Sequence, residues 1–409
     1  MTLRDRIRKP IDTLRSVMQF RPIELDPVKR RLARAADISD LRAIARRRIP
    51  RGVFDYIDGG AEDEITLTAN TQAFRRIEFR PRVLRDVSAV DPSTTLLGRP
   101  LPIPLVLAPT GFPRSIHPDG ELAAARAAAR AQLPYTLSTL STYSIEDVAA
   151  AARGPQWFQV YVWRDRGLVK EMIERAAVCG YEAIVLTVDT AVLGRRDRDV
   201  RHGFTMPPQL GLDTLVDGAR HPGWTWRFVR SDPIRFANVV GRDVGDGTSP
   251  VAIADYINTQ FDPSLSWRDL DWIRGVWDGP IVIKGIQTVA DARIAADAGI
   301  EAIALSNHGG RQLDSSPAII DLVEPVADAV GDRLEIICDG GIRRGGDIVK
   351  AIARGARACM AGRVHLYGLA AGGERGVEHA LTIIDRDVRR TMALVGARSV
   401  ADITRDLVS

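Results

Sequence analysis

Three side chains that can do acid–base chemistry or bind an anion lie close together in the stretch SNHGGRQLD, residues 306–314. His308 can take up a proton near neutral pH, Arg311 can bind a carboxylate through two N–H groups, and Asp314 can orient an imidazole. The stretch directly follows an apolar run, residues 302–305, whose composition predicts a buried strand. Two interpretations are open: a tight polar turn built around the two glycines, or one part of a reaction centre.

Polar side chains follow the other apolar runs of the chain in the same way. Taken singly, each has an ordinary explanation: Asp189 can cap a helix, Lys284 can form a salt bridge, and His308 can be a buried structural histidine. Together, one polar group or more at the end of every run is hard to attribute to packing. We therefore expect one site formed by Thr110, Ser138, Gln159, Tyr161, Thr187, Asp189, Lys284, His308, Arg311, Asp339 and Arg363.

The elements that must position these side chains follow a repeated pattern. Short apolar runs, typical of strands buried on both faces, alternate with amphipathic, alanine-rich stretches typical of helices. Eight strands alternating with helices predict an α/β fold, the (β/α)8 or TIM barrel, whose active site lies at the C-terminal ends of the strands. A doubly wound sheet is the alternative, and the absence of G-x-G-x-x-G after the first strand counts against it. The runs are residues 104–112, 134–140, 157–163, 183–190, 280–286, 302–310, 335–342 and 358–364.

One interval between strands is much longer than the others. Successive strand-end residues are 21 to 31 positions apart, but 95 positions separate Asp189 from Lys284. The excess predicts an insertion after the fourth strand, at about residues 197–263, rich in tryptophan and arginine. Two interpretations are open for it: a lid over the cleft, or an amphipathic segment that contacts a membrane surface.

Glycines and arginines follow the last two strands. DGGIRRGGD, residues 339–347, and AGRV, residues 361–364, stand where barrels of this kind commonly bind a phosphate through backbone N–H groups and a helix N-terminus. These loops predict a phosphorylated substrate or cofactor.

Composition narrows the class of protein. The 409 residues are 45% hydrophobic and 26% charged, and a net charge of +4 is too small to indicate binding to nucleic acid. Basic residues are concentrated in an N-terminal arm, residues 1–36, which suits an anionic membrane surface. The three cysteines have no metal-ligand spacing and predict reduced thiols, and we expect no metal site. With no apolar run long enough to cross a membrane and no recognisable secretory signal, a cytoplasmic location is expected.

Ordered motifs along most of the chain resemble those of one enzyme family. From about Asp37 to Leu407 the chain is similar to the FMN-dependent L-2-hydroxy-acid oxidases and dehydrogenases, which include glycolate oxidase, lactate oxidase and the flavin-linked lactate dehydrogenases. The resemblance implies two parts, the arm of residues 1–36 and a catalytic domain of residues 37–409. Its motifs are FDYIDGGAEDEITL (54–67), APTGF (108–112), LSTLSTYSIEDV (137–148), FQVYVWRDR (158–166), TVDTAVLGRRDRD (187–199), VIKGI (282–286), SNHGGRQLD, DGGIRRGGD and AGR.

The resemblance implies a division of labour around the substrate. His308 is expected to be the catalytic base, and Asp189, rather than Asp314, the carboxylate that orients it and stabilises its protonated form. Arg196 and Arg311 are expected to clamp the substrate carboxylate, because a planar guanidinium matches a carboxylate through two hydrogen bonds.

The remaining implied positions surround the substrate hydroxyl and FMN. Tyr56 and Tyr161 are expected to hydrogen-bond the substrate carboxylate and hydroxyl, and Lys284 to stabilise the negative charge of the reduced flavin. The positions expected to hold FMN are Pro109, Thr110, Gly111, Ser138, Gln159, Thr187, Lys284 and Ser306 around its ring, and Asp339, Gly340, Gly341, Arg343, Gly362 and Arg363 along its ribityl phosphate.

Two pocket positions depart from the oxidase pattern. Gly111 stands where glycolate and lactate oxidases usually carry alanine, and Leu140 where glycolate oxidase carries tryptophan. With the long insertion, they resemble the flavin-linked L-lactate dehydrogenases. The resemblance implies oxidation of L-lactate to pyruvate, transfer of electrons to a quinone or other acceptor, a homotetramer, and peripheral contact with the inner face of the cell membrane. The alternatives are an oxygen-using oxidase or monooxygenase, a flavin-free phosphate-binding isomerase or lyase, and an inactive membrane scaffold.

Overall fold

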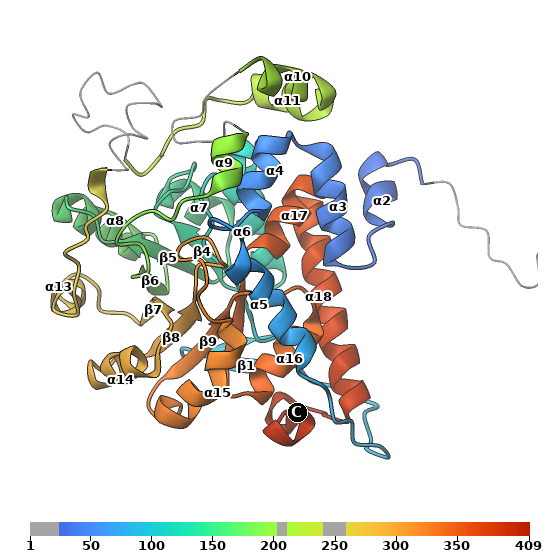
Figure 1. Ribbon diagram of the computed structural model, residues 1–409, viewed down its shortest axis with the longest axis vertical. Helices are drawn as coiled ribbons and strands as arrows, with labels where there is room; N and C mark the ends of the chain where they lie inside the picture. The colour runs from blue at the N-terminus through green and yellow to red at the C-terminus, as the bar shows by residue number, and fades with distance from the viewer. Residues whose placement is uncertain (1–23, 203–210, 240–258) are drawn as a thin grey trace, which may run out of the picture.

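The centre of the protein is a closed barrel of eight parallel strands, which confirms the predicted (β/α)8 fold (Figure 1). The computed structural model describes residues 24–202, 211–239 and 259–409. All eight predicted runs contribute a strand, and β10 pairs with β3 to close the barrel. The barrel strands are β3 (Leu105–Leu107), β4 (Tyr135–Ser138), β5 (Gln156–Tyr161), β6 (Ala183–Thr187), β7 (Ile281–Ile286), β8 (Ala302–Ser306), β9 (Glu335–Asp339) and β10 (Ala358–Ala361).

Burial explains why these short runs form strands. Nearly every residue of the barrel strands is buried, as expected for strands that carry side chains into the barrel on one face and against helices on the other. Val106, Trp157, Val282 and Met360 belong to the buried cluster inside the barrel, where their side chains fill the interior. The barrel is therefore a packed core, and the space for ligands lies at its end.

Helices connect and cover the strands in the predicted alternation. The stretches expected to be helical from their alanine-rich pattern form α6, α8 and α14. The long C-terminal helix α18 (Glu374–Val395) packs against α17 and α16. The covering helices are α6 (Gly120–Arg130), α7 (Ile145–Ala151), α8 (Arg166–Val178), α14 (Val289–Asp297), α15 (Ile319–Val330), α16 (Gly345–Ala353) and α17 (Arg363–Gly372).

An N-terminal helical extension precedes the barrel. It consists of α2 (Pro27–Leu32), α3 (Ile38–Arg48), α4 (Arg51–Asp58) and α5 (Ile65–Arg76), followed by the hairpin of β1 (Thr94–Leu96) and β2 (Arg99–Leu101). Helix α3 packs against α17, and α5 packs against α15, so this extension lies on the barrel. Most of the predicted basic arm, residues 1–23, lies outside the described residues.

The long connection between β6 and β7 carries the predicted insertion. It contains α9 (Asp197–Arg201), α10 (Leu212–Arg220), α11 (Pro222–Arg230) and α13 (Asp269–Arg274), and residues 203–210 and 240–258 lie outside the described part. In Figure 1, α10 and α11 form the upper rim of the molecule, beyond α9 and α4. Within the described residues, no helix is both long and apolar enough to cross a membrane. The division at residue 37 and the bounds 197–263 stay predictions.

Candidate active site

A cleft of about 1110 Å3, its open mouth included, lies at the C-terminal ends of the barrel strands. The structure thus brings residues from every predicted strand end, and from α4 and the start of the insertion, to one place. The predicted site residues that line this cleft are Tyr56, Pro109, Thr110, Gly111, Ser138, Leu140, Tyr161, Arg196, Lys284, His308, Arg311, Asp339, Gly340, Gly341, Arg343, Gly362 and Arg363.

The other predicted residues, Gln159, Thr187, Ser306 and Asp189, do not line the cleft but lie just behind it. The Gln159 side chain accepts a hydrogen bond from Ser138 Oγ at 3.1 Å and donates one to Thr187 Oγ1 at 2.9 Å. These bonds join β4, β5 and β6 at their C-terminal ends, and they fix the rotamer of the cleft residue Ser138.

A buried ion pair stands at the ends of β7, β8 and β9. Lys284 Nζ lies 2.9 Å from Asp339 Oδ2 and donates to Ser306 Oγ at 3.0 Å, and Ser306 donates in turn to Asp339 at 2.7 Å. Burial by itself would lower the pKa of Lys284, but the charges of Asp339 and Asp189 outweigh burial and raise it. Lys284 is therefore held as a cation inside the cleft.

The imidazole of His308 is oriented by a carboxylate from across the barrel. His308 Nδ1 lies 3.0 Å from Asp189 Oδ1, and its backbone N–H donates to Ser306 Oγ at 3.0 Å. Burial opposes ionisation of Asp189, but the charge and hydrogen bond of His308 prevail, and the pKa of Asp189 is lowered. Because Nδ1 faces Asp189, the other ring nitrogen, Nε2, is the one available to a substrate.

Glycine at position 285 makes room for that carboxylate. Gly285 has a φ of +113°, and a Cβ there would lie 2.8 Å from the Cβ of Asp189. The pairing of β7 with β8 shifts register between Lys284 and Ile286, on either side of this glycine. Any larger residue would strain the backbone and displace the partner of His308.

Two arginines flank the ring of Tyr56. The guanidinium carbon of Arg311 lies 5.0 Å from the ring centre, and that of Arg196 lies 5.9 Å away. Arg311 Nη1 donates to the carbonyl oxygens of Tyr56 at 2.5 Å and Gly59 at 3.1 Å, while Arg196 Nε pairs with Asp199 at 2.7 Å. Burial, and then the charge of Arg196, lowers the pKa of Arg311, so an anion bound between the two arginines would relieve their repulsion.

The two phenols of the cleft are kept protonated. Burial raises the pKa of Tyr56 and of Tyr161, and the nearby Asp189 raises that of Tyr161 further. Both hydroxyls can therefore donate a hydrogen bond to a bound anion or hydroxyl. In the structure the Tyr56 hydroxyl donates to the Gly111 carbonyl at 3.3 Å.

The opposite part of the cleft has the features of a phosphate site. Gly362 precedes α17, so the positive end of that helix points at the cleft, and Arg343 lines the same part. Gly341 has a φ of +81°, and a Cβ there would lie 2.2 Å from the carbonyl oxygen of Asn70. This position admits only glycine, which lets the backbone of the loop after β9 line the cleft.

Arg363 has a more structural position than the sequence indicated. Its side chain is buried and donates to three carbonyl oxygens, those of Ile57 at 3.1 Å, Gly309 at 2.9 Å and Gly59 at 2.7 Å. Burial lowers its pKa to about 10, which leaves it charged at neutral pH. It ties α4 to the loop after β8 and still presents charge to the cleft.

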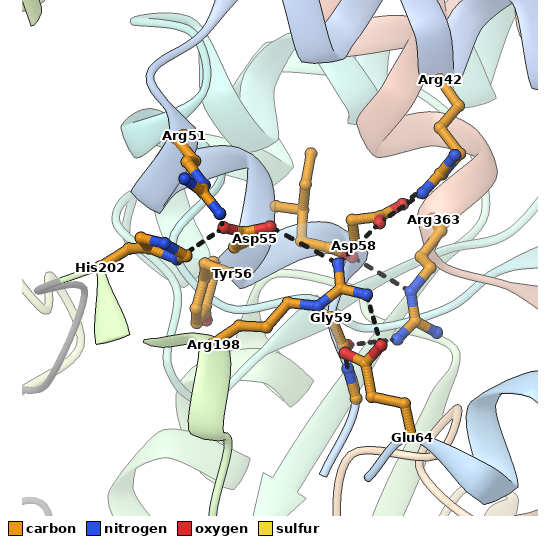
Figure 2. Close-up of polar contacts among 12 residues, drawn as sticks. Arg42, Arg51, Asp55, Tyr56, Asp58, Gly59, Glu64, Arg198, His202 and Arg363 are labelled. Carbon is orange, nitrogen blue, oxygen red and sulfur yellow. Dashed lines mark hydrogen bonds and ion pairs between the residues drawn. The ribbon is translucent and has the colours of Figure 1, made fainter. Parts of the chain in front are cut away.

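An ion-pair network that the sequence did not indicate joins α9 to α4 (Figure 2). Arg198 Nη1 lies 3.2 Å from Asp58 and 3.5 Å from Asp55, and its Nη2 donates to Glu64. Arg198 lies 134 to 143 positions after its three acidic partners, and the two motifs that contain these residues do not show that they pair. Because Arg198 is two positions after Arg196, the network fixes the start of the insertion beside the cleft.

The stretch SNHGGRQLD contains structural residues as well as site residues. Asp314 accepts hydrogen bonds from the backbone N–H groups of Ile65 at 3.2 Å and Thr66 at 2.8 Å, and so caps α5. Gln312, which sequence reasoning missed, donates to the carbonyl oxygen of Asp189 at 2.9 Å and holds the loop after β6. Its position directly after Arg311 in the motif was the sequence feature that could have identified Gln312 as a residue of the site.

Comparison with known proteins agrees with this geometry. The sequence model described as FMN-dependent dehydrogenase matches residues 45–409. The chain belongs to this family. A putative L-lactate dehydrogenase of Mycobacterium tuberculosis is 47% identical over 392 residues, which cover 96% of this chain and 93% of that protein. An L-lactate dehydrogenase of Caulobacter vibrioides is 44% identical over 372 residues, covering 91% and 97% of the two chains.

A solved structure resembles the whole fold of this FMN-dependent dehydrogenase. The monotopic membrane protein (S)-mandelate dehydrogenase superposes with a TM-score of 0.89 at 38% identity, covering 92% of this chain and 99% of that one. FMN is the cofactor of the family, and the residues present here fit it. The cleft offers a buried cation at Lys284, a helix N-terminus at Gly362 and loop backbone held close to the cleft by glycine at position 341.

Proposed function

We propose that this protein oxidises a small L-2-hydroxy acid, most directly L-lactate to pyruvate, with FMN as the first electron acceptor. The observation that carries the proposal is His308, which is oriented by Asp189 and lines the same cleft as Arg196 and Arg311. A base beside a carboxylate clamp is what removal of a proton from a 2-hydroxy acid requires. FMN, when bound, supplies the two-electron acceptor that the side chains lack.

Substrate binding depends on the two arginines and the two phenols. Arg196 and Arg311 bind the carboxylate through N–H groups that their protein partners leave free. Tyr56 and Tyr161, protonated because they are buried, donate hydrogen bonds to the carboxylate and the hydroxyl. These contacts place the 2-carbon and its hydroxyl against the imidazole and exclude water from the reacting atoms.

Proton removal depends on His308 and its partner. Nε2 takes the substrate proton, and the positive imidazolium that results is stabilised by Asp189, whose lowered pKa keeps it ionised. The substrate loses two electrons and two protons in all and leaves as the 2-keto acid. Lys284, held charged beside Asp339, supports negative charge that develops on its side of the cleft.

The choice of lactate rests on relatives and on the pocket. Both lactate dehydrogenases named above are more similar in sequence than the mandelate dehydrogenase, and Leu140 and Leu193 line the cleft with aliphatic groups that suit a methyl side chain. Rice glycolate oxidase is 41% identical, so glycolate is a second candidate. The test is the rate at which L-lactate, glycolate and (S)-mandelate each reduce the bound flavin. Faster reduction by glycolate or (S)-mandelate than by L-lactate would refute the assignment of lactate as substrate.

We also propose a quinone, rather than oxygen, as the second acceptor. Support comes from Gly111: a methyl there would lie 3.3 Å from the Tyr56 hydroxyl and 3.6 Å from Leu140 Cβ, so glycine leaves a space that the oxidases fill with alanine. The test is reoxidation of the lactate-reduced protein by air-saturated buffer and by a quinone analogue. Fast reoxidation by oxygen alone would establish the oxidase alternative instead.

Peripheral contact with a membrane completes the proposal. Exposed apolar side chains on α10 and α11 support it: Leu212, Leu215, Val216, Trp226 and Val229. Aromatic and aliphatic groups beside arginines suit a helix pair that lies in a lipid interface. This favours membrane contact over a lid for the insertion, and the proposed location is the inner face of the cell membrane. The proposed assembly is a homotetramer.

A further inference from the structure

Three half-buried arginines from separate helices lie close enough for their charges to repel one another. They are Arg31 of α2, Arg48 of α3 and Arg227 of α11, the insertion helix. Arg31 Nε donates to the Ala371 carbonyl at 2.6 Å, and Arg48 Nε to the Ala370 carbonyl at 3.2 Å. The terminal N–H groups of these two side chains have no partner within the described residues.

The charge of the cluster is mainly positive, and Asp26 offsets only a small part of it at Arg31. Burial, followed by the charge of Arg227, lowers the pKa of Arg31; burial, followed by the charges of Arg31 and Arg227, lowers that of Arg48 to about 10. No carboxylate in the described residues forms an ion pair with any of the three arginines. Asp26, the acid nearest to Arg31 in sequence, is paired with Arg375 at 2.5 Å. Such an arrangement is costly unless an anion joins it.

Arg227 is the residue whose hydrogen-bond donor most clearly lacks an acceptor among the described residues. Its Nε is fully buried and has no hydrogen-bond partner among the described residues, which is unfavourable for a charged donor. The helix is not free to swing the group into water, because the indole N–H of Trp224 donates to the Ser115 carbonyl at 2.8 Å and fixes α11 to the body.

Capping of α17 explains only part of this cluster. The last carbonyls of a helix attract cations, and Arg31 and Arg48 satisfy two of them. Capping uses one N–H group of each side chain and gives no role to Arg227. Each guanidinium has five N–H donors, so four remain on Arg31 and four on Arg48 after each has bonded one carbonyl.

A groove gives a ligand access to two of the three arginines. It lies between α2 and α3, and Asp40 is the single acidic residue among those that line it. The basic residues that line it are Arg30, Arg31, Arg34, Arg47 and Arg48. The groove therefore attracts an anion from solvent toward the half-buried cluster.

We propose that Arg31, Arg48 and Arg227 form a binding site for a phosphate group, separate from the FMN site. Phosphate suits the site better than a carboxylate because it offers several oxygens to guanidinium groups that approach from three helices. The phosphate belongs either to the headgroup of an acidic phospholipid or to a soluble phosphate. Exposed Trp226 and Val229 on α11, the helix that carries Arg227, favour the headgroup.

The test compares two triple variants of the FMN-loaded protein with equal loss of charge. One is Arg31→Gln, Arg48→Gln, Arg227→Gln. The control is Lys29→Gln, Arg46→Gln, Arg220→Gln, which removes exposed cations from α2, α3 and α10. Because FMN fills its own phosphate site, and oxalate added in excess fills the carboxylate clamp, stabilisation by inorganic phosphate then reports on other sites. The single variant Arg227→Gln serves if the first triple variant does not retain flavin.

Two readouts separate the sources of the phosphate. Inorganic phosphate should raise the melting temperature of the wild type and the control saturably, with an affinity reduced more than about tenfold in the cluster variant. Sedimentation with vesicles of phosphatidylcholine, with or without phosphatidylglycerol, should show that the cluster variant loses binding to the anionic vesicles and the control loses less. Loss of phosphate binding without this vesicle difference assigns the site to a soluble phosphate. Equal behaviour of both triple variants in both assays, or no saturable effect of phosphate on the wild type, overturns the proposal.

Discussion

Asp189 determines which nitrogen of His308 is available to a substrate, since its buried side chain lies 3.0 Å from Nδ1. The proposed chemistry needs this carboxylate in its ionised form, both to hold the ring and to stabilise the imidazolium. The backbone of His308 adopts a left-handed conformation, with φ of +57°, that few residues tolerate. His308, the proposed base, is therefore held by its side chain and its backbone together.

Asp189→Asn should lower kcat by about 100-fold or more with a smaller change in KM, because the amide keeps the shape but cannot stabilise the imidazolium. Stopped-flow reduction of the flavin measures this. Asp314→Asn is the matched control: it weakens the cap of α5, costing about 1 kcal/mol of unfolding free energy, and should leave the reduction rate nearly unchanged. Equal effects of both variants on the rate would contradict the assigned roles.

His365 should make the protein sensitive to acid. It is buried against Ala361 and Thr110, and burial lowers its pKa from 6.5 to about 4. Between these values the unfolded chain binds a proton that the folded chain does not, so stability falls as pH falls. The loss from pH 6.5 to 4 should reach about 3 kcal/mol.

Urea unfolding of the wild type and of His365→Gln across that pH range checks the expectation. The glutamine variant should show a flatter dependence of unfolding free energy on pH, whatever its stability at neutral pH. Parallel curves for the two proteins would show that another group controls acid stability.

Single residues also mark the limit of inference from sequence. Motif resemblance placed His308, Arg311 and Lys284 in one cleft, because the residue types and their positions at strand ends already suggest chemistry. It could not show that Arg363 donates three hydrogen bonds to backbone carbonyls, since those carbonyls come from segments distant in sequence. Hydrogen-bond partners of this kind are decided by tertiary packing.

At the scale of elements, the site depends on how α4 and α9 meet. Helix α4 carries Tyr56, and α9 begins directly after Arg196, so their contact sets the distance between a phenol and an arginine of the clamp. Arg198 makes this contact through Asp55 and Asp58 of α4 and also pairs with Glu64, and Figure 2 shows it at the centre of the network. Partly buried charges arranged in a network hold geometry better than an isolated surface pair.

Arg198→Gln should therefore raise KM for the hydroxy acid by about tenfold, with a smaller change in kcat, because the variant loosens Arg196 without touching His308. Steady-state kinetics with a soluble acceptor measure the two constants. Arg201→Gln, on the same helix and paired among the described residues with Asp197 alone, should behave as the wild type, and Arg198→Lys should restore part of the loss. A change confined to kcat would argue against a positioning role.

The strands were predicted from sequence and the contact between α4 and α9 was not. The difference lies in sequence separation, because a strand is a local pattern and this contact joins distant segments. The eight barrel strands are recognisable because each is a short apolar run that ends in polar residues, and each appears where expected. The contact of α4 with α9 was not predictable, because it joins segments about 140 positions apart through charges that look like ordinary surface residues.

At the scale of the whole molecule, barrel closure is what makes scattered residues into a site. Tyr56, Gly111, Asp189 and His308 come from four separate parts of the chain, and parallel strands in a closed barrel bring all their C-terminal ends to one rim. The connection between β6 and β7 and the N-terminal extension add Arg196 and Tyr56 over that rim. The fold supplies the rim, and these two segments complete the proposed clamp.

Anaerobic mixing of the purified flavoprotein with L-lactate tests the central claim most directly. The absorbance of oxidised flavin should bleach in the wild type, whereas His308→Ala should retain its flavin and bleach at least about 100-fold more slowly. A wild type that no L-2-hydroxy acid bleaches, or a His308→Ala variant that bleaches at the wild-type rate, would contradict the account.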